Sequence, residues 1–147
     1  MLKYYTRTWQ EELAKRIETD PKFLSDGQRL DGTRVFRVYE GPDGKDRLAM
    51  WTFEKGQCLS WKYEVQKSPW KKLREQPFDP KWTMRGATTF QMMAALNQGE
   101  ISPLRALASP EYKVEGSKLT ILQMMKPLTA WNQVAAGIAC TYHCRKE

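Results

Sequence analysis

The apolar residues near the N-terminus recur at the spacing of a helix. One face of that helix carries residues at four-residue intervals, Trp9, Leu13 and Ile17. The segment Thr8-Trp9-Gln10-Glu11 matches a capping box, in which a threonine hydroxyl and a glutamate carboxylate satisfy backbone amides at a helix start. We therefore predict an amphipathic helix from about Trp9 to Thr19, ended by Pro21 and packed against an apolar surface.

From Thr33 onward the period changes to the alternation of β-strands. A first β-rich run over 33–39 ends at the turn signal 41–44, and two further runs follow over 47–54 and 57–65. The third run alternates, and its apolar positions are Leu59, Trp61, Tyr63 and Val65. This pattern predicts an antiparallel meander with one apolar face.

The middle of the chain predicts an irregular segment, a strand and a helix. Residues 68–80 contain several prolines and many charges, which favours an irregular surface excursion. A fourth short strand is predicted over 81–85. The segment Thr88-Thr89-Phe90-Gln91 offers a second capping box, so a helix should run from about 90 to 96, with Gly99 near its C-terminal end.

The last third predicts a short helix, a strand and a long helical region. Ser102-Pro103 should start a helix that reaches residue 108, and the last strand should span 112–115. A helical region over 117–138 should be broken near Pro127, because a proline inside a helix removes a backbone hydrogen bond. Residues 140–147 are predicted to form a loosely held end.

These elements predict an α/β protein of the α+β type. Its mainly antiparallel sheet should have about five strands and be covered on one face by helices. A length of 147 residues suits one domain, which we predict to span residues 1–147. The chain is 41% hydrophobic and 28% charged, which is the ordinary mixture of a globular protein.

A formal net charge of +7 would attract nucleic acid or an anionic membrane surface if it were concentrated. The basic residues are instead spread along the chain, often beside acids. The one cluster comprises Lys67, Lys71, Lys72 and Arg74. We interpret this cluster as a solvated loop, with contact to a membrane or an acidic partner as the minor alternative, and we predict no nucleic-acid binding.

The sequence contains no apolar stretch of the length that a spanning helix needs, and its first residues lack the apolar run of a signal peptide. Its three cysteines are an odd number in a chain large enough to build its own core, which favours reduced thiols over a disulfide framework. Both features predict a soluble cytoplasmic protein.

The residues typical of catalysis are scarce. The single histidine, His143, stands close to the C-terminus, where it is poorly placed to act as the base of a catalytic triad. Cys140 and Cys144 flank it, but zinc normally needs four ligands, so we interpret these residues as incidental. No nucleotide-binding glycine-rich motif is present. We predict no catalytic residue, no metal, no cofactor and no enzymatic activity.

Soft apolar residues are concentrated in the second half of the chain. They are Met84, Phe90, Met92, Met93, Leu96, Leu104, Ile121, Leu122, Met124 and Met125. Methionine is unbranched and polarisable, so it lines cavities that close on irregular flexible ligands, but it also fills ordinary cores. The pattern alone predicts a methionine-rich core here.

The stretch from Trp82 to about Thr129 resembles the sterol carrier protein-2 family. The segments that carry the resemblance are Trp82-Thr83-Met84-Arg85, residues 90–100 ending in Gly99-Glu100, residues 101–107 with Pro103, and Tyr112-Lys113-Val114-Glu115-Gly116-Ser117. Their order and spacing match a strand, a helix, a proline-containing loop and a strand before a final helix. In that family an apolar tunnel between the sheet and the C-terminal helices takes sterols, fatty acids or acyl-CoA.

The resemblance implies that this chain binds, and in some settings transfers, such a ligand. By position the tunnel would be lined by Phe90, Met93, Leu96, Leu104, Leu107, Ile121, Leu122, Met124 and Met125, with Trp61 or Tyr63 contributed by the sheet. Met84 joins this set from the apolar concentration described above. Basic residues at the mouth would assist transient contact with an anionic membrane.

Two other functions remain open at this point. The fold would also suit a structural or interaction domain with a filled cavity, which would present Trp9, Trp70, Trp82 or Trp131 to a partner or form an oligomer. An enzyme acting on an acyl or other apolar substrate is the third alternative, for which the sequence offers no nucleophile and base pair.

Overall fold

A computed structural model describes residues 1–142 of the chain, and its centre is a five-stranded sheet in the order β4-β3-β2-β5-β6. The strands are β2 (Gly32–Tyr39), β3 (Lys45–Glu54), β4 (Gln57–Lys67), β5 (Met84–Thr89) and β6 (Lys113–Gly116). Neighbouring strands are antiparallel except for β2 and β5, which run parallel. The predicted α+β class and mainly antiparallel sheet are confirmed.

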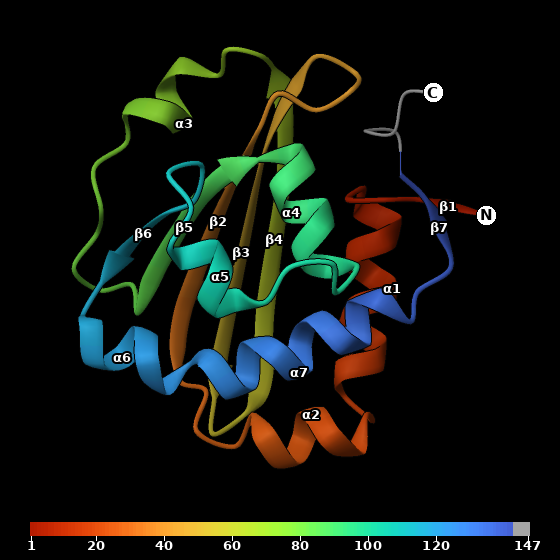
Figure 1. Ribbon diagram of the computed structural model, residues 1–147, viewed down its shortest axis with the longest axis vertical. Coiled ribbons are helices and arrows are strands. Elements are labelled where there is room, and N and C mark those ends of the chain that lie inside the picture. Colours follow the sequence, from red (N-terminus) through yellow and green to blue (C-terminus); the bar gives the residue numbers. More distant parts are fainter. Residues whose placement is uncertain (143–147) are drawn as a thin grey trace.

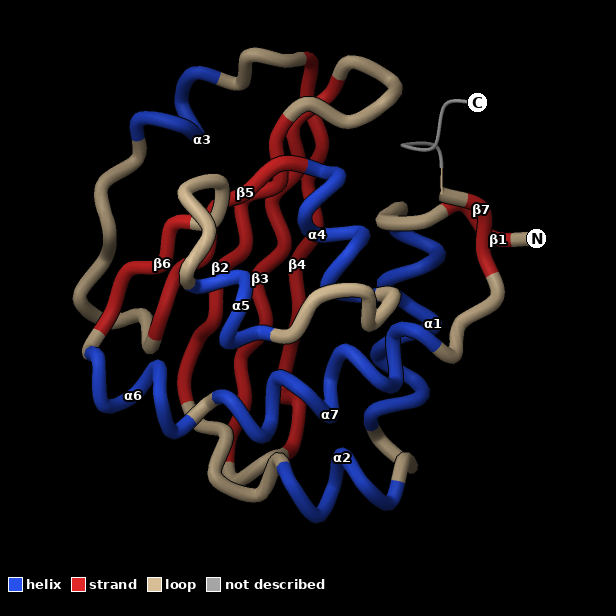
Figure 2. Tube along the Cα trace, in the orientation of Figure 1, coloured by secondary structure: helices blue, strands red, loops and turns tan. Residues whose placement is uncertain are grey.

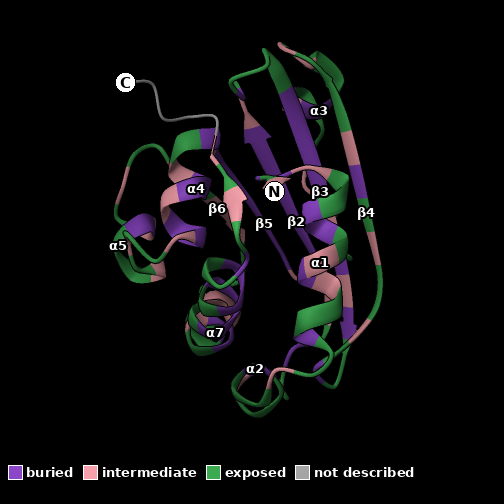
Figure 3. Ribbon diagram, turned by 90° about the vertical axis from the view of Figure 1, so that its right-hand side faces the viewer, coloured by how far each residue is buried: buried purple, intermediate pink, exposed green. Residues whose placement is uncertain are grey.

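Most helices cover one face of this sheet, which we call the inner face (Figure 1). They are α1 (Arg7–Ile17), α2 (Pro21–Asp26), α4 (Phe90–Asn97), α5 (Pro103–Leu107), α6 (Lys118–Gln123) and α7 (Met125–Ala136). The helix α7 crosses the strands and contacts α1, α2, α4 and α5, so it organises the whole layer. In Figure 3, β2, β3 and β5 are buried along most of their length beneath these helices, whereas β4 at the edge is more exposed.

The helix starts lie close to the predicted positions, but different threonines cap them. Thr6 caps α1 by accepting a hydrogen bond from the Trp9 amide, so the predicted Thr8 capping box is wrong. In the same way Thr89 caps α4, while the hydroxyl of Thr88 donates to the Glu111 carbonyl. The helix α1 ends at Ile17, before Pro21, and that proline begins α2, since a proline needs no hydrogen-bond partner in the first turn.

Strand β5 begins and ends later than predicted. It pairs with β2 from Met84 to Thr89, so it includes Gly86, which follows the strand predicted over 81–85. Tyr112 lies across Gly86, and a Cβ atom at this position would come within 2.7 Å of the Tyr112 hydroxyl. The glycine therefore makes room for a tyrosine on the inner face.

The final helical region breaks at Met124, between α6 and α7, which confirms the break predicted near Pro127 and places it three residues before the proline. Pro127 lies in the first turn of α7, where its missing amide has no partner to lose. The chain therefore changes direction three residues before the proline, next to a methionine that faces the core.

A bulge reverses the pattern of β4. The register shifts between Thr52 and Phe53, so Phe53 pairs with Cys58 while Trp51 pairs with Trp61. The additional residue, Leu59, is 59% exposed, and Cys58 packs against the core in its place. The prediction that Leu59 belongs to the apolar face is wrong for this reason.

The two ends of the described chain lie together. Leu2 and Lys3 form the short strand β1, which pairs in parallel with β7 (Cys140–Thr141), as Figure 2 shows. Residues 140 and 141 are thus part of a sheet, and the predicted loosely held end is wrong for them. His143 and Cys144 lie outside the described residues.

The opposite, outer face of the sheet is covered by the segment that follows β4. This segment contains the helix α3 (Lys71–Glu75), which the sequence pattern did not predict. Leu73 packs on Val35 and Leu48, and Trp70 and Trp82 lie beside them. The segment leads the chain across the outer face to β5, which explains how β5 comes to lie beside β2.

A buried carboxylate holds this segment in place. Asp46 is fully buried and accepts hydrogen bonds from Arg74 at 2.7 Å, from the Trp70 amide at 2.9 Å and from the Ser68 hydroxyl. Burial alone would raise the pKa of Asp46, but the hydrogen bonds from Arg74, Ser68 and two backbone amides outweigh it and hold the pKa well below its ordinary value.

Replacing Asp46 with asparagine should therefore destabilise the fold. We expect Asp46→Asn to lower the free energy of unfolding by about 2 kcal/mol at pH 7, because it removes the charge that Arg74 and the amides stabilise. Because folding depresses this pKa, the stabilisation is present above the unfolded value of about 4 and is lost as the pH falls below it. Urea denaturation at several pH values measures both effects.

The matched control is Glu75→Gln in α3, since the Glu75 side chain is 65% exposed and lies 3.9 Å from Lys71. We expect it to change stability by less than about 0.5 kcal/mol at either pH. Equal stability of Asp46→Asn and the wild type at pH 7 would contradict the role given to Asp46.

Candidate functional site

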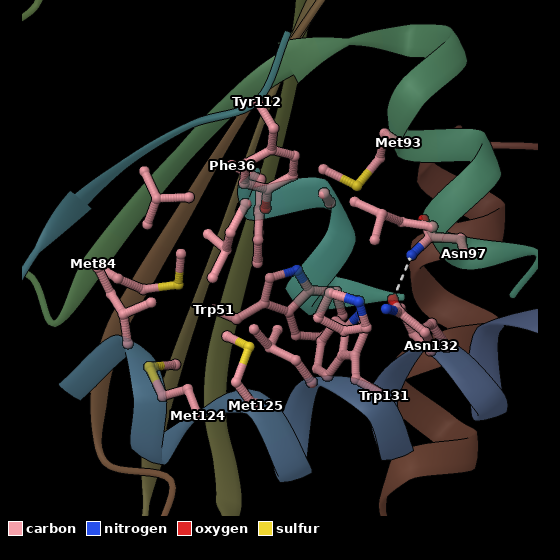
Figure 4. Close-up of a pocket in the computed structure, with 18 of the residues that line it drawn as sticks. Phe36, Trp51, Met84, Met93, Asn97, Tyr112, Met124, Met125, Trp131 and Asn132 are labelled. Carbon is pink, nitrogen blue, oxygen red and sulfur yellow. Dashed lines mark hydrogen bonds between the residues drawn. The ribbon is translucent and has the colours of Figure 1, made fainter. Parts of the chain in front are cut away.

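An apolar pocket lies between the inner face of the sheet and the helices α1, α4, α5, α6 and α7 (Figure 4). The sheet contributes Phe36, Trp51, Met84 and Val114, and the helices contribute most of the remaining wall. The unfilled space between the lining atoms and out to the mouth is about 660 Å³. The cavity left between the side chains has a volume of only about 40 Å³, so the side chains nearly fill the pocket.

Most of the residues that were predicted from the sequence to bind a ligand line this pocket. They are Met84, Met93, Leu96, Leu107, Ile121, Met124 and Met125. In the view of Figure 4, Met84, Met124 and Met125 gather at one end of the pocket, and Met93 lies near the opposite side. The break between α6 and α7 explains the grouping, because it turns both Met124 and Met125 towards the sheet.

The other predicted lining residues lie outside the pocket. Three of them contact other residues, and two are exposed. Trp61 stacks on Trp51 at the edge of the sheet, and the Tyr63 hydroxyl donates to the Tyr5 carbonyl. Phe90 packs edge-on against Tyr4. Leu104 and Leu122 point away from the pocket, with exposed fractions of 65% and 60%. The predictions that placed Trp61, Tyr63, Phe90, Leu104 and Leu122 in the tunnel wall are corrected accordingly.

The tryptophans suggested as a surface for a partner are buried or half-buried. Trp9 and Trp131 are buried in the main core, and Trp70 and Trp82 are half-buried over the outer face. Trp131 meets Trp51 edge to face, with ring centres 4.8 Å apart and planes at 85°. Figure 4 shows both indoles at the pocket, between α7 and the sheet.

One end of the pocket is polar, which the sequence pattern did not reveal. Asn97 on α4 donates through its side-chain amide to the side-chain oxygen of Asn132 on α7 at 3.0 Å (Figure 4). The Tyr4 hydroxyl donates in turn to the side-chain oxygen of Asn97. The Trp9 indole nitrogen is also buried at this end, without a hydrogen-bond partner among residues 1–142. Asparagine at otherwise apolar helix positions was the available signal, but only the fold brings Asn97 and Asn132 together.

A tyrosine and an arginine add polarity from the sheet side. Tyr112 precedes β6 and lines the pocket, where burial raises its pKa to about 12. The opposing influence comes from Arg34 on β2, which is buried on the same face of the sheet as Phe36. The alternation of Arg34 with Phe36 and Val38 could have placed this arginine on the inner face.

Among the described residues, 1–142, no three side chains of histidine, cysteine, aspartate or glutamate gather in a way that could hold a metal ion. Over the same part of the chain, no helix has the length and apolar character needed to cross a membrane. What the pocket offers chemically is apolar burial with a few hydrogen-bond donors at its wall.

Comparison with solved structures identifies the fold as that of sterol carrier protein 2. A crystal structure of sterol carrier protein 2 matches with a TM-score of 0.73 at 13% identity, over 93% of this chain and 100% of that one. A conserved hypothetical protein, possibly sterol carrier protein, from Thermus thermophilus also gives 0.73 at 13% identity, over 96% and 93%. The apo form of sterol carrier protein 2 from Yarrowia lipolytica gives 0.52 at 11% identity, over 87% and 89%.

No protein-family model and no curated protein matches the sequence. The structural likeness confirms the sterol-carrier-like fold that the motifs between Trp82 and Thr129 predicted. At sequence identities of 11–13%, the likeness concerns the fold alone.

The hydrogen bond between Asn97 and Asn132 should make their contributions to stability interdependent. Asn132→Leu leaves the Asn97 amide buried without its acceptor, which should cost about 1–3 kcal/mol. The double variant Asn97→Leu, Asn132→Leu should lose less stability than the sum of the two single variants, since neither amide is left without the other. The Tyr4 hydroxyl loses its acceptor in Asn97→Leu and in the double variant alike, so that loss cancels in the comparison. Denaturant unfolding of all three variants measures this coupling.

Gln133→Leu, at an exposed position next to Asn132 on α7, is the matched control and should be nearly neutral. Additive losses within about 0.5 kcal/mol would show that the two asparagines do not act as a pair.

Proposed function

We propose that this chain, which has the sterol carrier protein 2 fold, binds an apolar lipid of the sterol, fatty acid or acyl-CoA class in the pocket between its sheet and its helices. The observation that carries the proposal is the methionine-lined pocket itself. Burial of apolar ligand surface supplies about 25 cal/mol per Å² of affinity, and unbranched methionine side chains adapt to the shape of the ligand.

The pocket has to open before a lipid fits, because pockets that hold drug-sized ligands have volumes of roughly 300–1,000 Å³, far above the cavity of about 40 Å³ found here. The helix α6 is the element best suited to move. All of its residues are exposed or half-buried, and Ile121 is the one that lines the pocket. The break at Met124 separates α6 from the well-packed α7, so α6 can swing away without disturbing Trp131.

The same helix presents apolar residues outward. Leu119 and Leu122 are mostly exposed, and Lys118 stands beside them. We propose that this surface makes transient contact with an anionic membrane while a ligand is taken up or released. In this proposal the protein works in the cytoplasm as a carrier without enzymatic activity.

A second candidate follows from the narrowness of the pocket. Because its cavity has a volume of only about 40 Å³, the structure also suits an interaction domain whose cavity is permanently filled by its own side chains. Its partner would then contact the exposed leucines, Leu104, Leu119 and Leu122, in place of the tryptophans considered at first. Lipid uptake distinguishes the two candidates.

Delipidated protein should bind a fluorescent fatty acid and gain thermal stability with it. Leu107→Trp, which fills the pocket from α5, should weaken binding at least about tenfold, because the larger ring occupies space that the ligand needs. Fluorescence titration measures the affinity, and thermal unfolding with and without the lipid measures the stabilisation.

The matched control is Leu104→Trp on the same helix, since Leu104 is exposed outside the pocket. It should bind as the wild type does. Failure of the wild type to take up any of several sterols, fatty acids or acyl-CoA molecules would favour the interaction domain, and equal weakening by both variants would place the ligand elsewhere.

A further inference from the structure

Arg34 is buried in the middle of the apolar inner face. It lies on the central strand β2, where its register partners are Trp51 on β3 and Met84 on β5, both of which line the pocket. Its exposed fraction is 1%. A guanidinium group in such a position loses its hydration, so it is stable only if protein or ligand groups replace the lost water.

The described part of the chain supplies no hydrogen-bond acceptor to two of the guanidinium nitrogens. The Nε and Nη2 atoms of Arg34 are buried and have no hydrogen-bond partner among residues 1–142, and no acid of that part of the chain pairs with this arginine. Burial lowers the pKa of Arg34 to about 10, which leaves the group charged at neutral pH.

Other buried arginines of the sheet have hydrogen-bond partners within the protein. Arg85 donates to Glu115 at 2.7 Å, and Arg47 donates to Asp43 at 2.8 Å. Arg37, three residues after Arg34 and on the opposite face of the same strand, donates to the carbonyls of Leu73 and Arg74 and to Glu115. Arg47 lies on the inner face, as Arg34 does, and still has a carboxylate partner, so the lack of an anionic partner is specific to the position of Arg34.

The groups around Arg34 stabilise a cation only weakly. Its guanidinium carbon lies 5.5 Å from the ring centre of Phe36 and 5.6 Å from that of Trp131. Tyr112 is the further polar neighbour, and its phenol stays neutral because burial raises its pKa. Ring faces contribute about 0.5–2 kcal/mol each, less than a paired carboxylate inside a protein.

The two unpartnered atoms have a specific geometry. Nε and Nη2 lie on the same edge of the guanidinium plane, and their N–H groups point in parallel at the spacing of the two oxygens of a carboxylate. Phe36, Trp131 and Tyr112, which surround Arg34, all line the pocket. Arg34 itself does not form part of the pocket surface, so the rings beside it must shift as the pocket opens.

We propose that the pocket selects a lipid with a free carboxylate, which enters head first and is bound by the Nε and Nη2 atoms of Arg34, while its hydrocarbon chain lies along Met84, Met124 and Met125. This inference rests on the proposed lipid-binding function and narrows it. A neutral sterol leaves the guanidinium unpaired, and the large head group of an acyl-CoA does not fit in the interior.

The proposal also predicts that Arg34 destabilises the empty protein. A methionine at this position fills similar volume and carries no charge to be buried. Arg34→Met should therefore raise the melting temperature of delipidated protein by about 3 °C or more. An arginine with a structural role would give the opposite result, a loss of stability.

Two ligands of equal chain length test the selectivity, dodecanoate and 1-dodecanol, measured by displacement of a fluorescent lipid from delipidated protein. The wild type should bind the acid at least about tenfold more tightly than the alcohol, because a buried charge-assisted pair replaces a neutral contact. In Arg34→Met the two ligands should bind within about threefold of each other, with affinity for the alcohol unchanged.

Arg37→Met is the matched control, since it removes an arginine of the same strand that faces away from the pocket and has partners. It should lower stability and leave the preference for the acid intact. If Arg34→Met does not fold, Arg34→Lys takes its place: the charge remains, the paired N–H edge is lost, and the preference should fall markedly.

The outcomes separate this inference from the proposed function. Binding of dodecanoate and dodecanol with equal affinity by the wild type would overturn the role of Arg34 and leave lipid binding in place. Binding of neither ligand, nor of the fluorescent lipid, would refute lipid binding itself. A lower melting temperature of empty Arg34→Met with an unchanged preference for the acid would show that Arg34 is structural.

Discussion

The contact between Trp131 on α7 and Trp51 on β3 determines how the helical layer sits on the sheet. The two indoles meet edge to face, and Phe23 of α2 and Phe53 of β3 pack on the same Trp131 ring. Rings of this size fix the separation between α7 and the strands more firmly than aliphatic residues would. Beyond the rings, towards β5 and β6, smaller and more flexible side chains fill the space, and the pocket lies there.

The inner face around this contact is well packed, but some of its buried polar atoms have no hydrogen-bond partner within residues 1–142. Asn97 and Asn132 satisfy one another, as buried polar groups normally do, whereas Arg34 is left with two unpaired nitrogens. On the outer face, both carboxylate oxygens of Asp46 have partners, since they accept hydrogen bonds from Arg74, Ser68 and the Trp70 amide. On the same face Arg37 also has an Nε that is unpaired among the described residues, but its other guanidinium nitrogens donate to backbone carbonyls and to Glu115. Two unpaired nitrogens on one arginine beside the pocket are expected where a ligand is the missing partner, since the stability lost there returns on binding.

The candidate site could be predicted in part. The methionines and aliphatic residues of α4, α5, α6 and α7 were found because helical apolar stripes must face a core, and the resemblance to sterol carrier protein 2 indicated which core. Leu104 and Leu122 were misplaced, since a short helix with leucines on adjacent faces does not reveal which face is covered. Trp61 and Tyr63 were misplaced because the start of α1 lies over that part of the sheet, where Arg7 contacts both rings and Tyr5, just before the helix, accepts a hydrogen bond from Tyr63.

The sequence by itself determined the strands of the main sheet, most of the helices, their order and the fold class, because these follow from local periodicity and turns. It did not determine the short elements α2, α3, β1 and β7. Only the tertiary structure decided that Leu59 lies in a bulge, that the helical region turns at Met124, and that β5 lies parallel to β2. It also decided that Arg34 is buried without a partner, which depends on residues from β3, β5 and α7 converging on one point. Such convergence is a long-range property, whereas sequence patterns report which side of an element is apolar and not what meets it there.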